Sequence, residues 1–195
     1  MAATPRLITA RLVLREWRAE DHERYAALNA DPAVREFFPE RLTRAQSDAQ
    51  IAVFEDHFAA HGFGMWALAP RAGGELIGFT GMDLATYEAP FAPAVEIGWR
   101  LERSAWGHGY ATEAALATLE FGFERLELRE IVAATTPSNL RSRAVMERLG
   151  MTHDPRDDFD HPEIAAGHPL CRHVLYRLSA ERWRAPAPGA GRTPV

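Results

Sequence analysis

The chain has 195 residues, 47% of them hydrophobic and 25% charged, which is the composition of an ordinary globular protein with one sizeable core. Its formal net charge is −5 and no basic block is present, so we expect no nucleic-acid partner. The single cysteine, Cys171, excludes an internal disulfide framework and a cysteine-based zinc cluster. The N-terminus lacks the apolar core of a signal peptide, and no apolar run approaches the ~18 residues of a membrane span. We therefore expect a cytoplasmic protein with no membrane partner.

The first half of the chain predicts a strand, three helices and a hairpin. The expected elements are a strand over residues 11–17, helices over 19–30, from 31–32 and over 43–61, and strands over 65–69 and 75–83. Thr43-Arg44-Ala45-Gln46 is a capping box that marks the start of the third helix, and Gly62 ends that helix. Gly73-Gly74, between the last two strands, suits the turn of a hairpin.

The second half predicts strands that alternate with helices. The expected elements are a strand over 95–101, a helix from a glycine-rich turn to about 126, a strand over 130–136, a helix over 140–149, a polar loop over 154–169 and a strand over 171–178. Residues 184–195 are rich in Ala, Pro and Gly, which predicts a disordered tail after one domain over residues 5–183. The order predicts a mixed α/β (α+β) fold, with antiparallel hairpins before a strand-helix-strand unit.

The glycine-rich turn lies in Trp106-Gly107-His108-Gly109-Tyr110-Ala111-Thr112-Glu113-Ala114, between the strand over 95–101 and the next helix. Glycines let a backbone approach a ligand closely. The free N–H groups of a first helical turn and the helix dipole both favour negative charge. The segment therefore predicts a site for a phosphorylated cofactor.

Three kinds of phosphate site compete for this turn. A P-loop requires a lysine, and the chain contains none. A dinucleotide-binding turn has the motif Gly-x-Gly-x-x-Gly and lies near the first strand. This turn instead comes late in the chain, and Thr112 stands where the third glycine belongs. The third possibility is the pyrophosphate of coenzyme A.

Two segments, 106–114 and 139–151, together resemble the GNAT acetyltransferase superfamily, in particular its RimJ/RimL-like N-acetyltransferase branch. The strand motifs Arg-Leu-Val-Leu-Arg at 11–15 and Glu-Ile-Gly-Trp-Arg-Leu at 96–101 fit that branch as well, and the resemblance reaches to about residue 177. It implies a mostly antiparallel, twisted sheet of about six to seven strands flanked by helices, around a strand-helix-strand unit that binds acetyl-CoA. Acetyl-CoA would be the acetyl donor.

The resemblance also implies which residues bind acetyl-CoA. Backbone amides of the turn would hold the pyrophosphate, a strand would follow the pantetheine arm, and the start of the next helix would flank the cofactor. The residues in these three roles are, in order, Gly107, His108, Gly109, Tyr110, Ala111 and Thr112; Trp99, Arg100 and Leu101; and Asn139 and Arg143. Trp106 departs from the family signature, which has Arg or Gln at its position. His108 as an exposed turn residue and Arg143 as an exposed helix charge are the alternatives.

Glu96 is our candidate for the catalytic base. An amine with a pKa of about 8 to 10.4 is mostly protonated at pH 7, so a base assists its attack on a thioester. Glu96 lies on the strand beside the cofactor turn, in a run of residues that otherwise reads as buried. The alternative is a paired structural carboxylate.

Ser142 is our candidate for the proton donor to the leaving thiolate, or for a group that orients the thioester. Many GNAT enzymes have a tyrosine seven residues after the asparagine of the last motif, but that position holds Met146, which has no proton to donate. Ser142 lies one helical turn after Asn139, on the same face. The alternative is that Ser142 is a surface serine and that water donates the proton. A backbone N–H of residues 99–101 would polarise the carbonyl.

The acceptor is expected to contact the first helix pair and the loops over 85–93 and 154–169. The second loop is acidic, which favours a cationic small-molecule, antibiotic or peptide amine, and Glu36, Phe37 and Phe38 add an aromatic wall. His161, His168 and His173 do not have the spacing of a metal site, so we expect no metal. A non-catalytic acyl-CoA sensor or interaction module stays open as an alternative, and either a monomer or a homodimer is compatible with the sequence.

Overall fold

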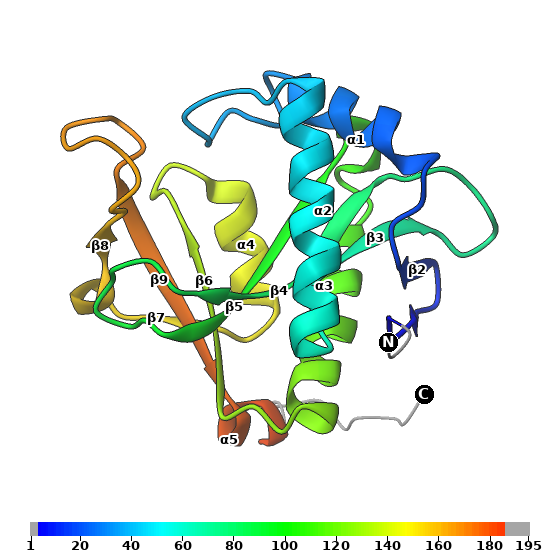
Figure 1. Ribbon diagram of the computed structural model, residues 1–195. Helices are drawn as coiled ribbons and strands as arrows, with labels where there is room; N and C mark the ends of the chain where they lie inside the picture. Colours follow the sequence, from blue (N-terminus) through cyan, green and yellow to red (C-terminus); the bar gives the residue numbers. More distant parts are fainter. Residues whose placement is uncertain (1–3, 186–195) are drawn as a thin grey trace.

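The computed structural model describes residues 4–185, and Figure 1 shows a twisted sheet flanked by helices. The strands are β1 (Leu7–Ile8), β2 (Leu12–Arg15), β3 (Met65–Pro70), β4 (Gly78–Ala85), β5 (Ala94–Leu101), β6 (Glu130–Thr135), β7 (Thr152–His153), β8 (Phe159–Asp160) and β9 (Arg172–Ser179). The helices are α1 (Asp21–Ala30), α2 (Arg44–His61), α3 (Tyr110–Glu120), α4 (Leu140–Arg148) and α5 (Ala180–Arg184). A π-helical turn, Phe121–Arg125, continues α3.

The strands lie in the order β1-β2-β3-β4-β5-β6-β9-β7, and β8 pairs with β9. Neighbouring strands are antiparallel except for β5 and β6, which flank α3 in the chain. This confirms the predicted mixed sheet around a strand-helix-strand unit. The described residues form nine strands rather than six to seven, because β1, β7 and β8 have two residues each and are too short to show a periodic pattern.

The pairing of β5 with β6 is confined to one place. Glu96 and Val132 are the single registered pair between these strands, although β5 continues to Leu101 and β6 to Thr135. Beyond that pair the two parallel strands separate toward their C-terminal ends. Backbone N–H and C=O groups on this side of β5 are therefore left for a ligand, because such groups bond to a partner or to water.

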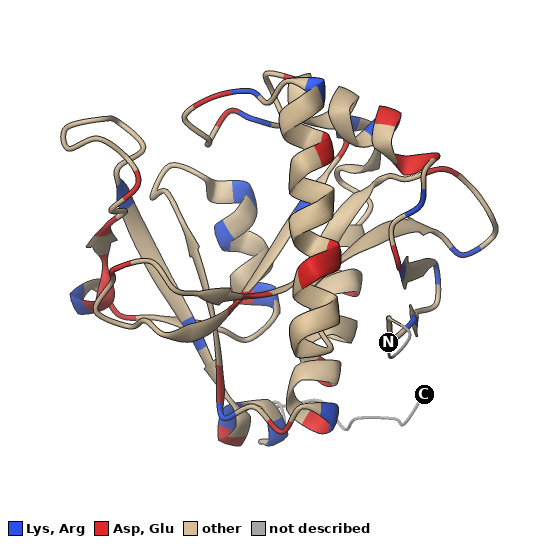
Figure 2. Cartoon of the chain, viewed as in Figure 1, with Lys and Arg blue, Asp and Glu red and all other residues tan. Residues whose placement is uncertain are grey.

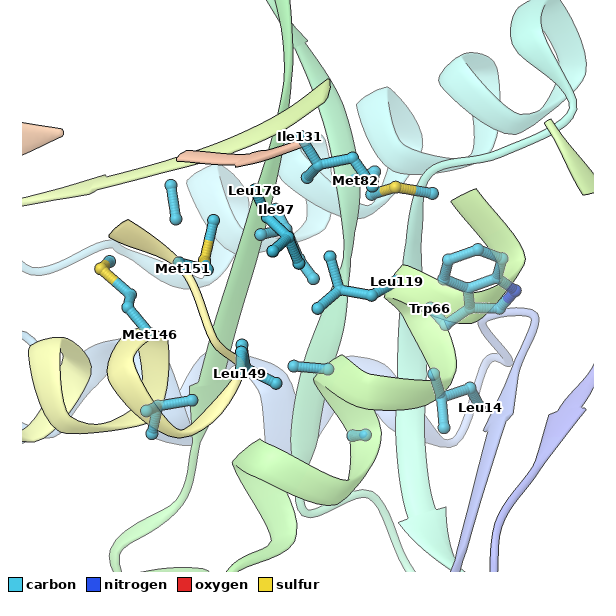
Figure 3. Close-up of a cluster of buried hydrophobic side chains, with 14 of the residues drawn as sticks. Leu14, Trp66, Met82, Ile97, Leu119, Ile131, Met146, Leu149, Met151 and Leu178 are labelled. Atoms are coloured by element: carbon cyan, nitrogen blue, oxygen red, sulfur yellow. The ribbon is translucent and has the colours of Figure 1, made fainter. Parts of the chain in front are cut away.

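The two faces of the sheet bury separate apolar cores. The face covered by α3 and α4 holds the larger core, shown in Figure 3, which includes Trp66, Met82, Ile97, Leu119, Ile131, Met146 and Leu149. The face covered by α1 and α2 holds an aromatic core that includes Trp17, Tyr25, Phe54 and Phe79. Because successive strand residues alternate between faces, Ile97 and Leu101 of β5 belong to the first face, whereas Glu96 and Arg100 point to the second.

The capping signals around α2 are confirmed, but the short helix expected from Asp31 is wrong. Thr43 and Gln46 form the reciprocal capping box, and Gly62 ends α2 in the left-handed conformation with φ 75°. After α1 the chain instead makes successive turns. The Asp31 carboxylate accepts a bond from the Ala33 N–H, and both Nε and Nη2 of Arg35 donate to the Glu40 carbonyl, which folds the segment back on itself.

No helix in the part of the chain that the structure covers is long and apolar enough to cross a bilayer. Arg184, which the sequence assigns to the tail, is the last residue of α5. The rest of the predicted disordered tail, from residue 186 to 195, lies outside the described residues.

Candidate active site

A cleft of about 1420 Å³ opens where β5 and β6 separate. Its walls come from β5, the glycine turn and the start of α3, the start of α4, and the turns that follow α1. The predicted site residues that line it are Glu96, Trp99, Arg100, Leu101, Gly107, Gly109, Tyr110, Ala111, Thr112, Asn139 and Ser142. The fold therefore gathers most of the predicted site around one cavity.

The glycine turn has the geometry of an anion cradle. Gly107 has φ 79° and Gly109, the N-cap of α3, has φ 78°, a region that side chains other than glycine rarely adopt. The N–H groups of residues 110–112 have no acceptor among the described residues, so the first turn of α3 leaves them facing the cleft. Three free N–H groups at the positive end of a helix suit a pyrophosphate.

Glu113 braces this turn against the connection between β1 and β2, a contact that no local signal in the sequence indicates. Its carboxylate accepts hydrogen bonds from the Thr9 hydroxyl at 2.6 Å and from the Arg11 N–H at 2.8 Å and Nε at 2.6 Å. Burial alone would raise the pKa of Glu113, but these bonds outweigh it and hold the pKa below its usual value. Arg11 also donates to the His108 carbonyl at 2.9 Å, so it fixes both the turn and the helix start.

Trp106, the departure from the family signature, has a structural role. Its indole N–H donates to the Leu101 carbonyl at 2.8 Å, which ties the glycine turn to the end of β5. The guanidinium of Arg141, at the start of α4, lies 4.6 Å from the centre of the Trp106 ring. Trp106 therefore joins three walls of the cleft, while the backbone cradle does not depend on its side chain.

Glu96 lies at the point where the two strands part. One carboxylate oxygen accepts a bond from the Ala134 N–H of β6 at 3.2 Å, and the other accepts one from the Tyr87 hydroxyl at 3.1 Å. Burial raises the pKa of Glu96 to about 7, although the bonds from Tyr87 and Ala134 act in the opposite direction. A carboxyl with that pKa changes its charge near neutral pH, which suits a general base.

Ser142 and Asn139 occupy the start of α4. Asn139 is the N-cap: its side-chain oxygen accepts from the Ser142 N–H at 3.2 Å and its amide donates to the Thr135 hydroxyl at 2.9 Å. These bonds use the Asn139 side chain structurally. The Ser142 hydroxyl lines the cleft and makes no hydrogen bond within residues 4–185, so it is open to a ligand.

His108 and Arg143 are the two predicted cofactor residues that do not line the cleft. The exposed His108 ring stacks 5.5 Å from the ring of Tyr110. Arg143 donates to the Tyr176 hydroxyl at 3.3 Å and to the Pro137 carbonyl at 3.0 Å. The structure thus brings the backbone of the turn to the cleft, but not these two side chains.

Four of the five acidic side chains in the 154–169 loop lie close to a basic side chain. Its aspartates lie in ion pairs, namely Asp154 with Arg156, Asp157 with Arg177, Asp158 with His153 and Asp160 with Arg172. Figure 2 shows acidic and basic positions close together around β8 and β9. No residue of 154–169 lines the cleft, whereas Phe37 and Phe38 of the expected aromatic wall do.

Comparisons with known proteins agree with this geometry. A family profile described as the acetyltransferase (GNAT) domain matches residues 11–152. The chain is 32% identical to the FsC-acetyl coenzyme A-N(2)-transacetylase of Aspergillus fumigatus, over 93% of this chain and 79% of that protein. An acetyltransferase structure from Agrobacterium tumefaciens matches with a TM-score of 0.72 and 30% identity, over 91% of this chain and 96% of that one. Mycobacterium smegmatis RimJ, in complex with CoA-disulfide, shares the fold with a TM-score of 0.73 at 20% identity, over 93% and 90% of the two chains.

The separating strands, the unpaired N–H groups of the turn and the cleft between them define a transferase that uses an acyl-coenzyme A donor. The chain belongs to the GNAT acetyltransferase family. It is an acetyl-CoA-dependent N-acetyltransferase, and acetyl-CoA is its acetyl donor.

Proposed function

We propose that this enzyme acetylates a primary amine, on a small molecule or a peptide N-terminus, by direct attack in a ternary complex with acetyl-CoA. The observation that carries the proposal is Glu96, a carboxyl in the cleft whose pKa lies at about 7. The sequence motifs favour the RimJ/RimL-like branch of the family. The use of acetyl-CoA suits the cytoplasmic location that we expect from the sequence.

The proposal assigns binding groups on this chain to three parts of the donor. The N–H groups of residues 110–112 would bind the pyrophosphate, and the open edge of β5 would bond to the pantetheine amides as a strand partner does. A backbone N–H of Trp99–Leu101 would polarise the thioester carbonyl. The N–H groups of residues 110–112 fit the pyrophosphate because no residue in the described part of the chain accepts hydrogen bonds from them.

Glu96 and Ser142 divide the proton transfers. The amine nitrogen forms its bond to the acetyl carbon and loses a proton to Glu96, directly or through water, while the carbon–sulfur bond breaks. Ser142 gives its proton to the departing sulfur and regains one from solvent. The products are the acetylated amine and free coenzyme A, with the Glu96 proton returned to solvent.

A screen of acetyl-CoA consumption over peptides, polyamines and amine drugs tests this proposal, with Glu96→Gln and Ser142→Ala as variants. Loss of an acid or base typically lowers kcat/KM by about 10²–10⁴-fold. Glu55→Gln is the matched control, because Glu55 is an exposed carboxylate on α2 outside the cleft. A loss of less than about threefold in both Glu96→Gln and Ser142→Ala would refute the assigned roles.

A binding module without turnover is the alternative. Its distinguishing result is calorimetric binding of acetyl-CoA with no acetylation of any amine in the screen. The pKa of Glu96 favours the enzyme, because a sensor has no need of a carboxyl that titrates near pH 7.

A further inference from the structure

One face of β4 and β5 presents charges of both signs to the cleft. Asp83 lies opposite Glu96 in the pairing of these strands, and Phe79 lies opposite Arg100. Paired residues of antiparallel strands share a face, so all four point toward α1 and α2. Asp83, Glu96, Phe79 and Arg100 all line the cleft.

Arg100 has a guanidinium whose hydrogen-bond donors are not all paired within the described residues. Its Nη1 donates to the Asn29 side-chain oxygen at 2.7 Å, but its Nε has no hydrogen-bond partner in the part of the chain described. Its guanidinium carbon lies 4.2 Å from the centre of the Phe38 ring and 5.1 Å from that of Phe79. Burial lowers the pKa of Arg100 to about 10, as expected for a cation with too few compensating charges.

Arg35 is a second cation that contacts the same Phe38 ring, although it does not line the cleft. Its guanidinium carbon also lies 4.2 Å from the Phe38 ring, and its hydrogen bonds go to the Glu40 backbone carbonyl rather than to a carboxylate. Arg15 shows the contrasting case. Arg15 is as buried as Arg35, but it forms a bidentate pair with Asp21 at 2.6 and 2.8 Å.

The two carboxylates of this face, Glu96 and Asp83, lie at the end away from Arg100. Glu96 is four residues from Arg100 along β5, so their Cα atoms are about 13 Å apart at the usual strand rise. Asp83 stands beside Glu96 and faces His57, whose Nε2 lies 2.9 Å from the Asp83 carboxylate. An amine would be drawn to the acidic end, and an anion would be repelled from it toward Arg100.

We propose that the acceptor amine also carries a carboxylate, which binds Arg100 while the amine lies at Glu96 and Asp83. This inference rests on the proposed function and specifies its substrate class. A guanidinium pairs with a planar carboxylate through parallel N–H donors, and a buried cation gains most from such a partner. The separation of the two ends further specifies an amine and a carboxylate several bonds apart, rather than on one carbon. This differs from the cationic acceptor that the acidic loop suggested.

The test compares kcat/KM for ε-aminocaproate with that for its methyl ester and for pentylamine, and includes glycine as the short amino acid. The acid should be preferred over the ester and the amine by about 10- to 100-fold, the range of a charged hydrogen bond, and glycine should be poor. In Arg100→Gln the preference should collapse through a higher KM for the acid. Arg100→Lys should restore part of it, because the charge returns without the planar fork.

Arg129→Gln is the matched control, since Arg129 is an exposed arginine outside the cleft, and it should keep the full preference. Thermal melting of each variant verifies that it is folded. Equal or better use of pentylamine by the unaltered enzyme, or an unchanged preference in folded Arg100→Gln, would overturn the inference. Acetylation of none of these amines, nor of any in the wider screen, would instead overturn the proposed function.

Discussion

The Glu96 carboxylate accepts a hydrogen bond from the Ala134 backbone N–H at 3.2 Å, across the gap where β5 and β6 part. The bond lies just beyond the single registered pair of these strands, so the side chain replaces a backbone partner as the strands separate. The carboxyl is therefore held where the strands part, and burial raises its pKa to about 7. Fold and proton chemistry are linked at this residue.

Tyr87→Phe should move the pH dependence of catalysis to higher pH. The Tyr87 hydroxyl donates to the Glu96 carboxylate and lowers its pKa, so its removal should raise that pKa further. The midpoint of the kcat/KM profile reports the change. Tyr176→Phe is the control, because Tyr176 bonds to Glu147 outside the cleft, and an equal shift in that variant would refute this account.

Glu96→Gln should stabilise the protein at alkaline pH but not at acid pH. The pKa of Glu96 is about 7 in the folded protein against 4.5 for the free group, so its stabilising effect is complete below about pH 4.5 and is lost as pH rises through 7. The variant should therefore gain about 1–3 kcal/mol at pH 8 relative to the unaltered protein. Urea unfolding at pH 4.5 and 8 measures this. The same difference at both pH values would argue against a raised pKa.

Gly109→Ala should weaken acetyl-CoA binding beyond its effect on stability. At φ 78° an alanine is strained by about 1–2 kcal/mol, and relief of that strain would turn the N–H groups of α3 away from the donor. Gly73→Ala is the matched control, because Gly73 has φ 92° in the turn between β3 and β4, outside the cleft. Calorimetry should show a higher Kd in Gly109→Ala alone. Equal Kd values in the two variants would refute the proposal that this turn binds the pyrophosphate of acetyl-CoA.

Local signals in the sequence predicted the elements well. The Thr43–Gln46 capping box and Gly62 bounded α2, and the glycine turn marked the start of α3, because each signal works through neighbours in the chain. The short helix after Asp31 was wrong because Arg35 folds that segment back onto the Glu40 carbonyl.

Relationships between distant residues were not predictable in this way. Glu113 and Arg11 meet only because α3 packs against β1 and β2, and Arg100 meets Phe38 only because the turns after α1 reach β5. The sequence shows that the 154–169 loop is acidic, but the arginines on β9 that pair with this loop come from another part of the sequence. Charge in a sequence therefore indicates little about a site until its partners are known.

The pH dependence of kcat/KM, measured for the unaltered enzyme and Glu96→Gln on one amine acceptor, tests the central claim most directly. The unaltered enzyme should gain activity as pH rises through about 7, where Glu96 loses its proton. Glu96→Gln should lack this rise and keep only the titration of the acceptor itself. An undiminished rise through pH 7 in Glu96→Gln would contradict the account.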